Sequence, residues 1–134
     1  MKLKQCLLYI AAVLALGLFT TLADAQARVT VKFPRGSHSA SAKGTITDYK
    51  YIDYVLGARA RQNMVIELQS QDDKAQLVVL DPDQINVEYG TGVAQYSGEL
   101  EKSGNYTVRV LLSRAEARRS KNGATRFVIT FTIK

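Results

Sequence analysis

Hydrophobic and polar residues alternate with a period of two along most of the chain. In residues 63–70 the apolar residues Met64, Ile66 and Leu68 fall on one side, with polar residues between them. This alternation is typical of a strand that buries one face. Similar patterns or short apolar runs occupy residues 28–33, 44–48, 51–58, 63–70, 76–80, 93–100, 105–112 and 126–134. The sequence therefore predicts an all-β fold, an antiparallel β-sandwich of about seven or eight strands.

One segment, SRAEARRSKNG at residues 113–123, breaks the alternation between the last two predicted strands. Ser113 can cap a helix, and Glu116 three residues later completes an S-x-x-E capping box. The residues that follow Ser113 are good helix formers, and Asn122 with Gly123 is a typical helix stop. The pattern predicts one short helix of about two turns at this position.

The predicted helix is strongly basic. Arg114, Arg118 and Lys121 recur at helical spacing on one face, and Arg119 lies about 100° around the helix from Arg118. Arg114 falls near the positive end of the helix dipole, where a cation is mildly unfavourable. Arginine binds carboxylates bidentately and is easier to desolvate than lysine. These features favour a surface for an acidic partner, although a charged run is also typical of a solvated helix without a partner.

The first 25 residues have the composition of a secretory signal peptide. Two lysines precede an apolar run of roughly 14 residues, and residues 23–25 (ADA) form a small-x-small cleavage site. The run is shorter than the ~20 residues of a membrane-spanning helix. We expect a single exported domain over residues 26–134 that does not insert into a membrane. Cys6 is the only cysteine and would leave with the leader, so no disulfide is expected.

Charge narrows the choice of partners. Residues 26–134 contain 16 Lys and Arg against 11 Asp and Glu, a net charge of +5, and six of the 16 cations lie between Arg109 and Arg126. Basic proteins bind nucleic acid, anionic membranes or acidic protein surfaces. Export argues against nucleic acid, so a local basic patch for a protein partner is the favoured interpretation.

Three tyrosines in DYKYIDY, which are Tyr49, Tyr51 and Tyr54, form a second candidate contact surface. Tyrosine is enriched among interface anchors. If the strand begins this early, Tyr49 and Tyr51 point one way and Tyr54 the other. One of the two sets could instead pack in the core.

Patterns for catalysis or cofactor binding are missing from the sequence. His38, the only histidine, lies in a Ser- and Gly-rich segment, residues 34–44, that is interpreted as a flexible loop without a nucleophile elbow. Asp72 with Asp73, and Asp81 with Asp83, could bind calcium in a loose site, but residues 81–90 lack the Gly and Glu of an EF-hand. We therefore predict a binding protein with no catalytic residues, no metal and no cofactor, and not an enzyme.

Two stretches, GTITDYKYIDYVLGARA with the QNM that follows and SGNYTVRVLLSRAEARR, resemble the periplasmic inhibitors of goose-type (g-type) lysozyme of Gram-negative bacteria. The resemblance covers nearly all of residues 26–134 and departs at Arg61, where the family often has Gly. A broader Gly and Tyr skeleton is shared with small β-sandwich domains of bacterial secreted proteases and implies the fold alone. The most specific motif, G-x-Y-x-x-R-V followed by R-x-x-A-R, comprises Gly104, Tyr106, Arg109, Val110, Arg114, Ala117 and Arg118.

The resemblance implies a periplasmic β-sandwich that plugs the active-site cleft of a g-type lysozyme from a host or a competitor. It implies contacts from Arg114 and Arg118, with Tyr49 nearby. A rigidly presented guanidinium would pair with the acidic residues that cleave the sugar chain. The candidate protein-binding residues are Arg114, Arg118, Arg119, Tyr49 and Tyr51.

Two alternatives remain at this point. The first is a cell-envelope carbohydrate- or peptidoglycan-binding module that stacks sugars on the tyrosines. The second is a structural envelope protein whose basic helix lies on anionic lipid, which is disfavoured because Ala115 and Ala117 are almost its whole apolar face. The oligomeric state stays open, with a monomer favoured.

Overall fold

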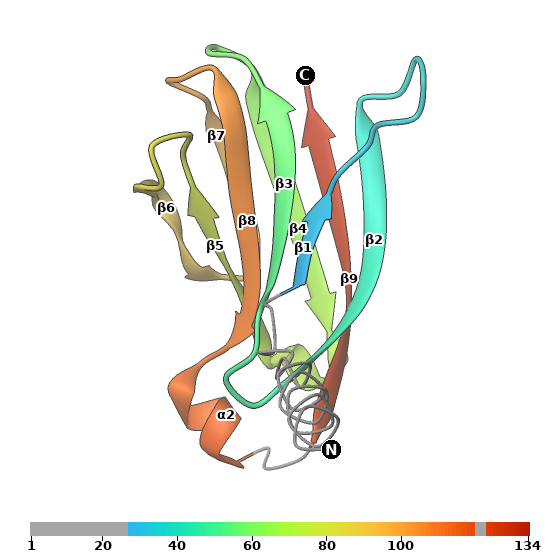
Figure 1. Ribbon diagram of the computed structural model, residues 1–134, viewed down its shortest axis with the longest axis vertical. Helices are drawn as coiled ribbons and strands as arrows, with labels where there is room; N and C mark the ends of the chain where they lie inside the picture. Colours follow the sequence, from blue (N-terminus) through green and yellow to red (C-terminus); the bar gives the residue numbers. More distant parts are fainter. Residues whose placement is uncertain (1–26, 120–122) are drawn as a thin grey trace, which may run out of the picture.

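In the computed structural model, which describes residues 27–119 and 123–134, the protein consists of two β-sheets packed face to face (Figure 1). One sheet has the strand order β1-β3-β8-β5-β6, and the other has the order β2-β9-β4-β7. This arrangement confirms the predicted β-sandwich. The strands are β1 (Ala27–Thr30), β2 (Ser39–Thr47), β3 (Ile52–Ala58), β4 (Asn63–Ser70), β5 (Ala75–Leu80), β6 (Asn86–Val93), β7 (Gln95–Glu99), β8 (Gly104–Leu112) and β9 (Ala124–Ile133).

Two short helical segments connect strands. The 3-10 turn η1 (Gln71–Asp73) follows β4, and the helix α2 (Arg114–Arg119) lies between the last two strands, as predicted. No helix within the described residues is long and apolar enough to cross a membrane. The predicted signal peptide, residues 1–25, lies outside the described residues, as do Lys121 and Asn122 at the predicted helix end.

The flexible loop predicted over residues 34–44 is wrong in its second half. β2 begins at Ser39 and pairs with β9 along its whole length. The Ser41 hydroxyl lies 3.0 Å from the Thr130 hydroxyl, and the Ser39 hydroxyl lies 3.3 Å from that of Thr132. Small polar residues that resemble a loop in the sequence therefore line the outer face of a paired strand.

The sequence pattern also fails to predict β6, so the sandwich has more strands than expected. Tyr89 and Gly92 in β6 have positive φ angles of 59° and 69°, and the pairing with β5 shifts register twice. These irregularities disrupt the two-residue period by which strands are recognised. A further difference is that β1 pairs parallel with β3, so the first sheet is not wholly antiparallel.

The core between the sheets follows the predicted alternation. β9 presents Phe127, Ile129, Phe131 and Ile133 inward, and β8 presents every second residue from Tyr106 to Leu112. Tyr54 belongs to this core, because its ring lies edge-on to Phe127 with centroids 6.3 Å apart. A Cβ at Gly44 would lie 2.5 Å from the Phe127 ring, so glycine is needed there for the close approach.

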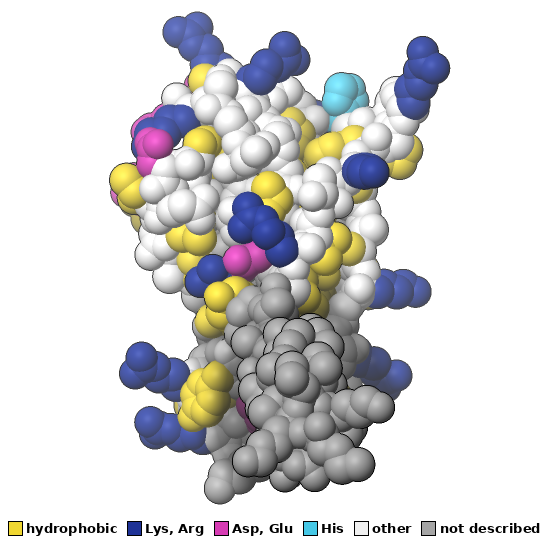
Figure 2. Space-filling model, in the orientation of Figure 1, with side chains coloured by type: hydrophobic (Ala, Val, Ile, Leu, Met, Phe, Trp, Pro, Cys, Tyr) yellow, Lys and Arg dark blue, Asp and Glu magenta, His cyan; other side chains and the backbone are white. Residues whose placement is uncertain are grey.

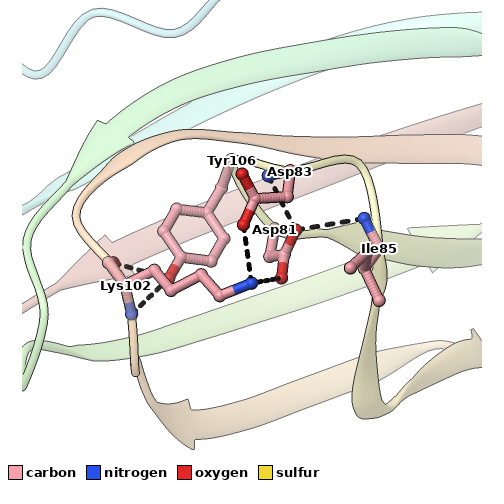
Figure 3. Close-up of polar contacts among 5 residues, drawn as sticks. All are labelled: Asp81, Asp83, Ile85, Lys102 and Tyr106. Atoms are coloured by element: carbon pink, nitrogen blue, oxygen red, sulfur yellow. Dashed lines mark hydrogen bonds and ion pairs between the residues drawn. The ribbon is translucent and has the colours of Figure 1, made fainter.

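Gly104 and Tyr106 of the G-x-Y-x-x-R-V motif fix a loop at one end of the sandwich. Gly104 has a φ of 144° and lies against Pro82, where a Cβ would approach within 2.9 Å. The Tyr106 hydroxyl donates a hydrogen bond to the Lys102 carbonyl (2.7 Å) and accepts one from the Lys102 N–H (3.3 Å; Figure 3). Such a tyrosine corner holds the start of a sandwich strand. These two motif residues therefore support the fold.

Arg61, where the family that the sequence resembles often has Gly, adopts a strained backbone conformation. Arg61 has a φ of 72°, and its N–H donates to the Leu100 carbonyl at 2.7 Å. A left-handed residue other than glycine costs on the order of 1–2 kcal/mol. The turn tolerates Arg61 at that cost, and a glycine there relieves it.

Candidate protein-binding site

The helix α2 and the β2–β3 turn lie at the same end of the sandwich (Figure 1). α2 leads from β8 to β9, and residues 48–51 lead from β2 to β3. The last residue of β2 pairs with the first residue of β9. The first residue of β3 pairs with Val110 near the end of β8. Both connections therefore lie where the β2–β9 pair and the β3–β8 pair end. This brings the predicted arginine and tyrosine segments to one end of the molecule.

The cap of α2 is present as predicted, although only half of the capping box forms. The Ser113 hydroxyl accepts a hydrogen bond from the Glu116 N–H at 3.2 Å. The Glu116 carboxylate binds the Arg119 guanidinium, also at 3.2 Å, instead of returning to Ser113. Ala117 is buried and anchors the helix against the core. The cap and this anchor fix the orientation of a helix that is too short to be stable alone.

The three helix arginines differ in their surroundings. Arg119 pairs with Glu116 but remains 75% exposed, and it lies in the last turn where the helix dipole favours a cation. Arg114 and Arg118 are exposed, and no carboxylate of the described residues lies within ion-pair distance of either. These two guanidinium groups are therefore available to an external anion.

The tyrosines do not act as one surface. Tyr49 is 64% exposed in the β2–β3 turn. Tyr51 is half-buried, and the Arg109 guanidinium lies 4.0 Å from its ring centroid. Neither residue belongs to β3, so the predicted strand alternation does not apply to them. Figure 2 shows exposed hydrophobic surface between Lys and Arg side chains at the α2 end. Of the tyrosine cluster, Tyr49 is the exposed member at this end, whereas Tyr54 is in the core.

Arg109 has a structural role that the charge pattern does not reveal. It lies directly opposite Asp53 in the β3–β8 register and donates to both carboxylate oxygens, at 2.8 and 3.0 Å. The bidentate bond to Asp53 raises the pKa of Arg109 further above its ordinary value. The Asp53 side chain is 11% exposed and that of Arg109 is 32% exposed. This pair with the Tyr51 contact braces the strands next to the β2–β3 turn.

Further cations lie near this end on the other sheet. Arg126 pairs in register with Thr45, and Lys43 pairs with Val128 two positions away on the same face. Both cations line a shallow hollow of about 410 Å³, and neither has a carboxylate partner among the described residues. The sequence does not indicate that Lys43 lies near Arg126, because the two residues belong to strands that are far apart in the chain. The basic surface thus extends beyond α2.

The calcium site considered for Asp81 and Asp83 is wrong, because a lysine occupies the space between them (Figure 3). The Lys102 ammonium lies 2.7 Å from Asp81 Oδ2 and 2.8 Å from Asp83 Oδ2. Asp81 Oδ1 accepts the N–H groups of Asp83 and Ile85. No group of three possible metal ligands exists within the described residues. His38 lies in an exposed loop at the opposite end from α2.

This lysine–aspartate cluster predicts a pH-dependent stability. The hydrogen bond from Lys102, followed by that from the Ile85 N–H, holds the pKa of Asp81 below its ordinary value. The cluster therefore stabilises the fold fully above that ordinary value and loses its effect as the pH falls through the lowered pKa. We expect Lys102→Met to lower the melting temperature at neutral pH. The difference from wild type should shrink between about pH 5 and pH 2.

Thermal melts followed by circular dichroism across this pH range would measure the difference. Lys74→Met is the matched control, because Lys74 approaches Asp72 only to 4.0 Å. A Lys102→Met difference that stays constant down to pH 2 would show that the loss is one of packing and not of charge.

Comparisons with known proteins agree with this architecture. No family model matches the chain. A curated relative from Escherichia coli (strain K12), "Inhibitor of g-type lysozyme", is 30% identical over 119 residues, covering 82% of this chain and 86% of its own length. The crystal structure of Aeromonas hydrophila PliG, a periplasmic inhibitor of g-type lysozyme, has a TM-score of 0.70 at 32% identity, covering 81% of this chain and 96% of its own.

A more distant structure shares the fold alone. The pre-peptidase C-terminal domain of a collagenase from Bacillus anthracis has a TM-score of 0.56 at 13% identity, and the match covers 82% of this chain and 97% of that domain. This likeness shows the sandwich fold and carries no activity from one protein to the other.

Proposed function

Because the chain belongs to the family of the g-type lysozyme inhibitors, we propose that it is a periplasmic protein that binds a g-type lysozyme and blocks the active-site cleft. The observation that carries the proposed contact surface is the pair of exposed arginines on α2. Arg114 and Arg118 lack a carboxylate partner within the described residues and share one end of the sandwich with the exposed Tyr49.

The chemistry of the target explains why arginine suits this surface. Glycosidases cleave the sugar chain with paired carboxyl groups in a cleft, one of which must donate a proton. A guanidinium bound bidentately to such a carboxylate holds it in the ionised form and fills the space of the substrate. Arg114 and Arg118 are one helical turn apart, so both can approach a single cleft.

The surrounding residues support rapid and specific docking. Tyr49 offers an exposed aromatic ring at the same end of the sandwich as the arginines, and such rings are common at the centre of interfaces. The positive surface around Arg114 and Arg118 is extended by Arg119, Arg126 and Lys43. Complementary charge accelerates encounter and is weakened by salt. Tyr51 supports the site indirectly, because its ring is covered by Arg109.

Inhibition assays with purified lysozymes test the proposal. We expect the protein to slow lysis of bacterial cell walls by a g-type lysozyme, with weaker or no effect on c-type and i-type enzymes, and to lose association rate as salt is raised. A lack of inhibition of any lysozyme at micromolar protein would overturn the proposed function.

The alternative of a carbohydrate-binding module has little support from the tyrosines. Of the three tyrosines in DYKYIDY, Tyr54 is in the core, Tyr51 is covered by Arg109, and Tyr49 is exposed. A stacking platform of several rings is therefore not formed. The relatives are inhibitors, in agreement with the prediction of a binding protein and not an enzyme.

A further inference from the structure

A groove of about 460 Å³ lies between β6 and β7 and has no role in the proposed inhibition. Its walls come from residues 85–89 on one side and residues 96–102 on the other. The loop between β5 and β6 contributes to it, and β5 runs from Ala75, opposite the end of β8 near α2, to Leu80 at the far end. Figure 1 shows the β5–β6 connection at the opposite end of the sandwich from α2. The groove is therefore remote from α2, and we expect a lysozyme bound at α2 to leave it open.

Negative charge gathers in this groove although the protein is basic. Glu88, Glu99 and Glu101 line it, and none has a cationic partner among the described residues. The neighbouring carboxylates of Asp81 and Asp83 are already paired with Lys102. Three glutamates without partners leave the groove negatively charged, and this charge favours a cationic ligand.

The same groove exposes apolar surface. Tyr89 is 85% exposed with a left-handed φ of 59°, and Ile85 is 59% exposed. Figure 2 shows acidic and hydrophobic side chains together at this edge of the molecule. Charges on an edge strand can serve to prevent self-association, but an exposed Tyr and Ile beside them have the opposite effect. Protection of the edge therefore does not account for the combination.

Both walls of the groove are open strand edges. β6 ends one sheet and β7 ends the other. An edge strand presents unpaired N–H and C=O groups to which an extended peptide can hydrogen-bond. A groove that offers carboxylates, an aromatic face and a strand edge matches the side chains and the backbone of a basic peptide.

We propose that the β6–β7 groove binds an extended, lysine- or arginine-bearing peptide segment of a second protein. The glutamates bind its cationic groups, Tyr89 receives a cation or an alkyl stem on its ring, and a strand edge pairs with its backbone. The protein would then hold this partner and a lysozyme at the same time, at opposite ends of the sandwich.

Chemical-shift mapping of the ¹⁵N-labelled protein tests the proposal with a blocked peptide of alternating lysine and valine. We expect shifts confined to residues 85–89 and 96–102. The paired substitution Glu99→Gln with Glu101→Gln should raise the dissociation constant about tenfold or more, and Tyr89→Ala by a similar factor. Asp72→Asn with Asp73→Asn is the matched control, since it removes two charges near α2 and should leave peptide binding unchanged.

Three results with the lysine–valine peptide would overturn the proposal. They are no shifts at millimolar peptide, shifts centred on α2, and equal binding by the glutamine variant with its dispersed spectrum intact. Equal shifts with chitotetraose or with a glutamate–valine peptide would identify a sugar site or unspecific binding and would also refute it. Lysozyme inhibition should be unaffected by the glutamine substitutions, so this test and that of the proposed function fail independently.

Discussion

Replacement of Arg114 and Arg118 together by alanine will weaken inhibition of a g-type lysozyme by about a thousandfold or more. Truncation of one partner of a buried charge pair at an interface costs about 2–5 kcal/mol, and about 1.4 kcal/mol is tenfold in affinity. The stability of the free protein should change little, because neither guanidinium has an ion-pair partner in the described structure. Steady-state inhibition constants for the double variant and both single variants measure the effect.

The matched control is Arg35→Ala with Arg59→Ala, which removes two exposed arginines at the opposite end of the sandwich. This control should lower the association rate slightly through the loss of net charge and leave the dissociation rate unchanged. If the α2 double variant inhibits as well as wild type while its melting temperature is preserved, the proposed contact surface is wrong.

Replacement of Arg109 by alanine will destabilise the fold by about 2–3 kcal/mol, the largest effect expected for a single charged residue here. Removing one partner of a buried ion pair costs about 3–5 kcal/mol, and the partial exposure of Arg109 lowers that figure. The variant leaves the nearly buried Asp53 carboxylate without its bidentate donor. Urea denaturation of the two proteins would give the difference in free energy of unfolding.

The reverse change should cost less. Asp53→Asn leaves Arg109 partly exposed to water and in contact with the Tyr51 ring. Arg126→Ala, on the outer face of β9, is the control for loss of an arginine without an ion pair and should stay within about 0.5 kcal/mol of wild type. Equal stability of the Arg109→Ala and Arg126→Ala variants would contradict the structural role of the Asp53–Arg109 pair.

Most of the strands and the short helix can be predicted from local patterns in the sequence. The alternation in β8 and β9 and the Ser113 cap are local features, and the structure contains each of them. The strand over Ser39–Gly44 and the whole of β6 escaped prediction for a physical reason. Their strand character comes from pairing with remote segments, because neither sequence alternates strongly in hydrophobicity.

The candidate site shows the same division. The arginine cluster is visible in the sequence because helix spacing is local. Its proximity to the β2–β3 turn depends on how β2 pairs with β9 and β3 with β8, which no local pattern specifies. The Asp53–Arg109 pair joins residues 56 positions apart, and Lys102 lies between two aspartates about 20 positions earlier. Such long-range pairs are beyond any reading of local spacing.

Hydrogen exchange with and without a g-type lysozyme would show both whether the protein binds the enzyme and whether the α2 end forms the contact. Backbone N–H groups that an interface buries exchange more slowly. We expect slower exchange in residues 48–51 and 113–119, with residues 85–89 in the β6–β7 groove unchanged. Protection of the groove instead of the α2 end, or no protection at a saturating lysozyme concentration, would contradict this expectation.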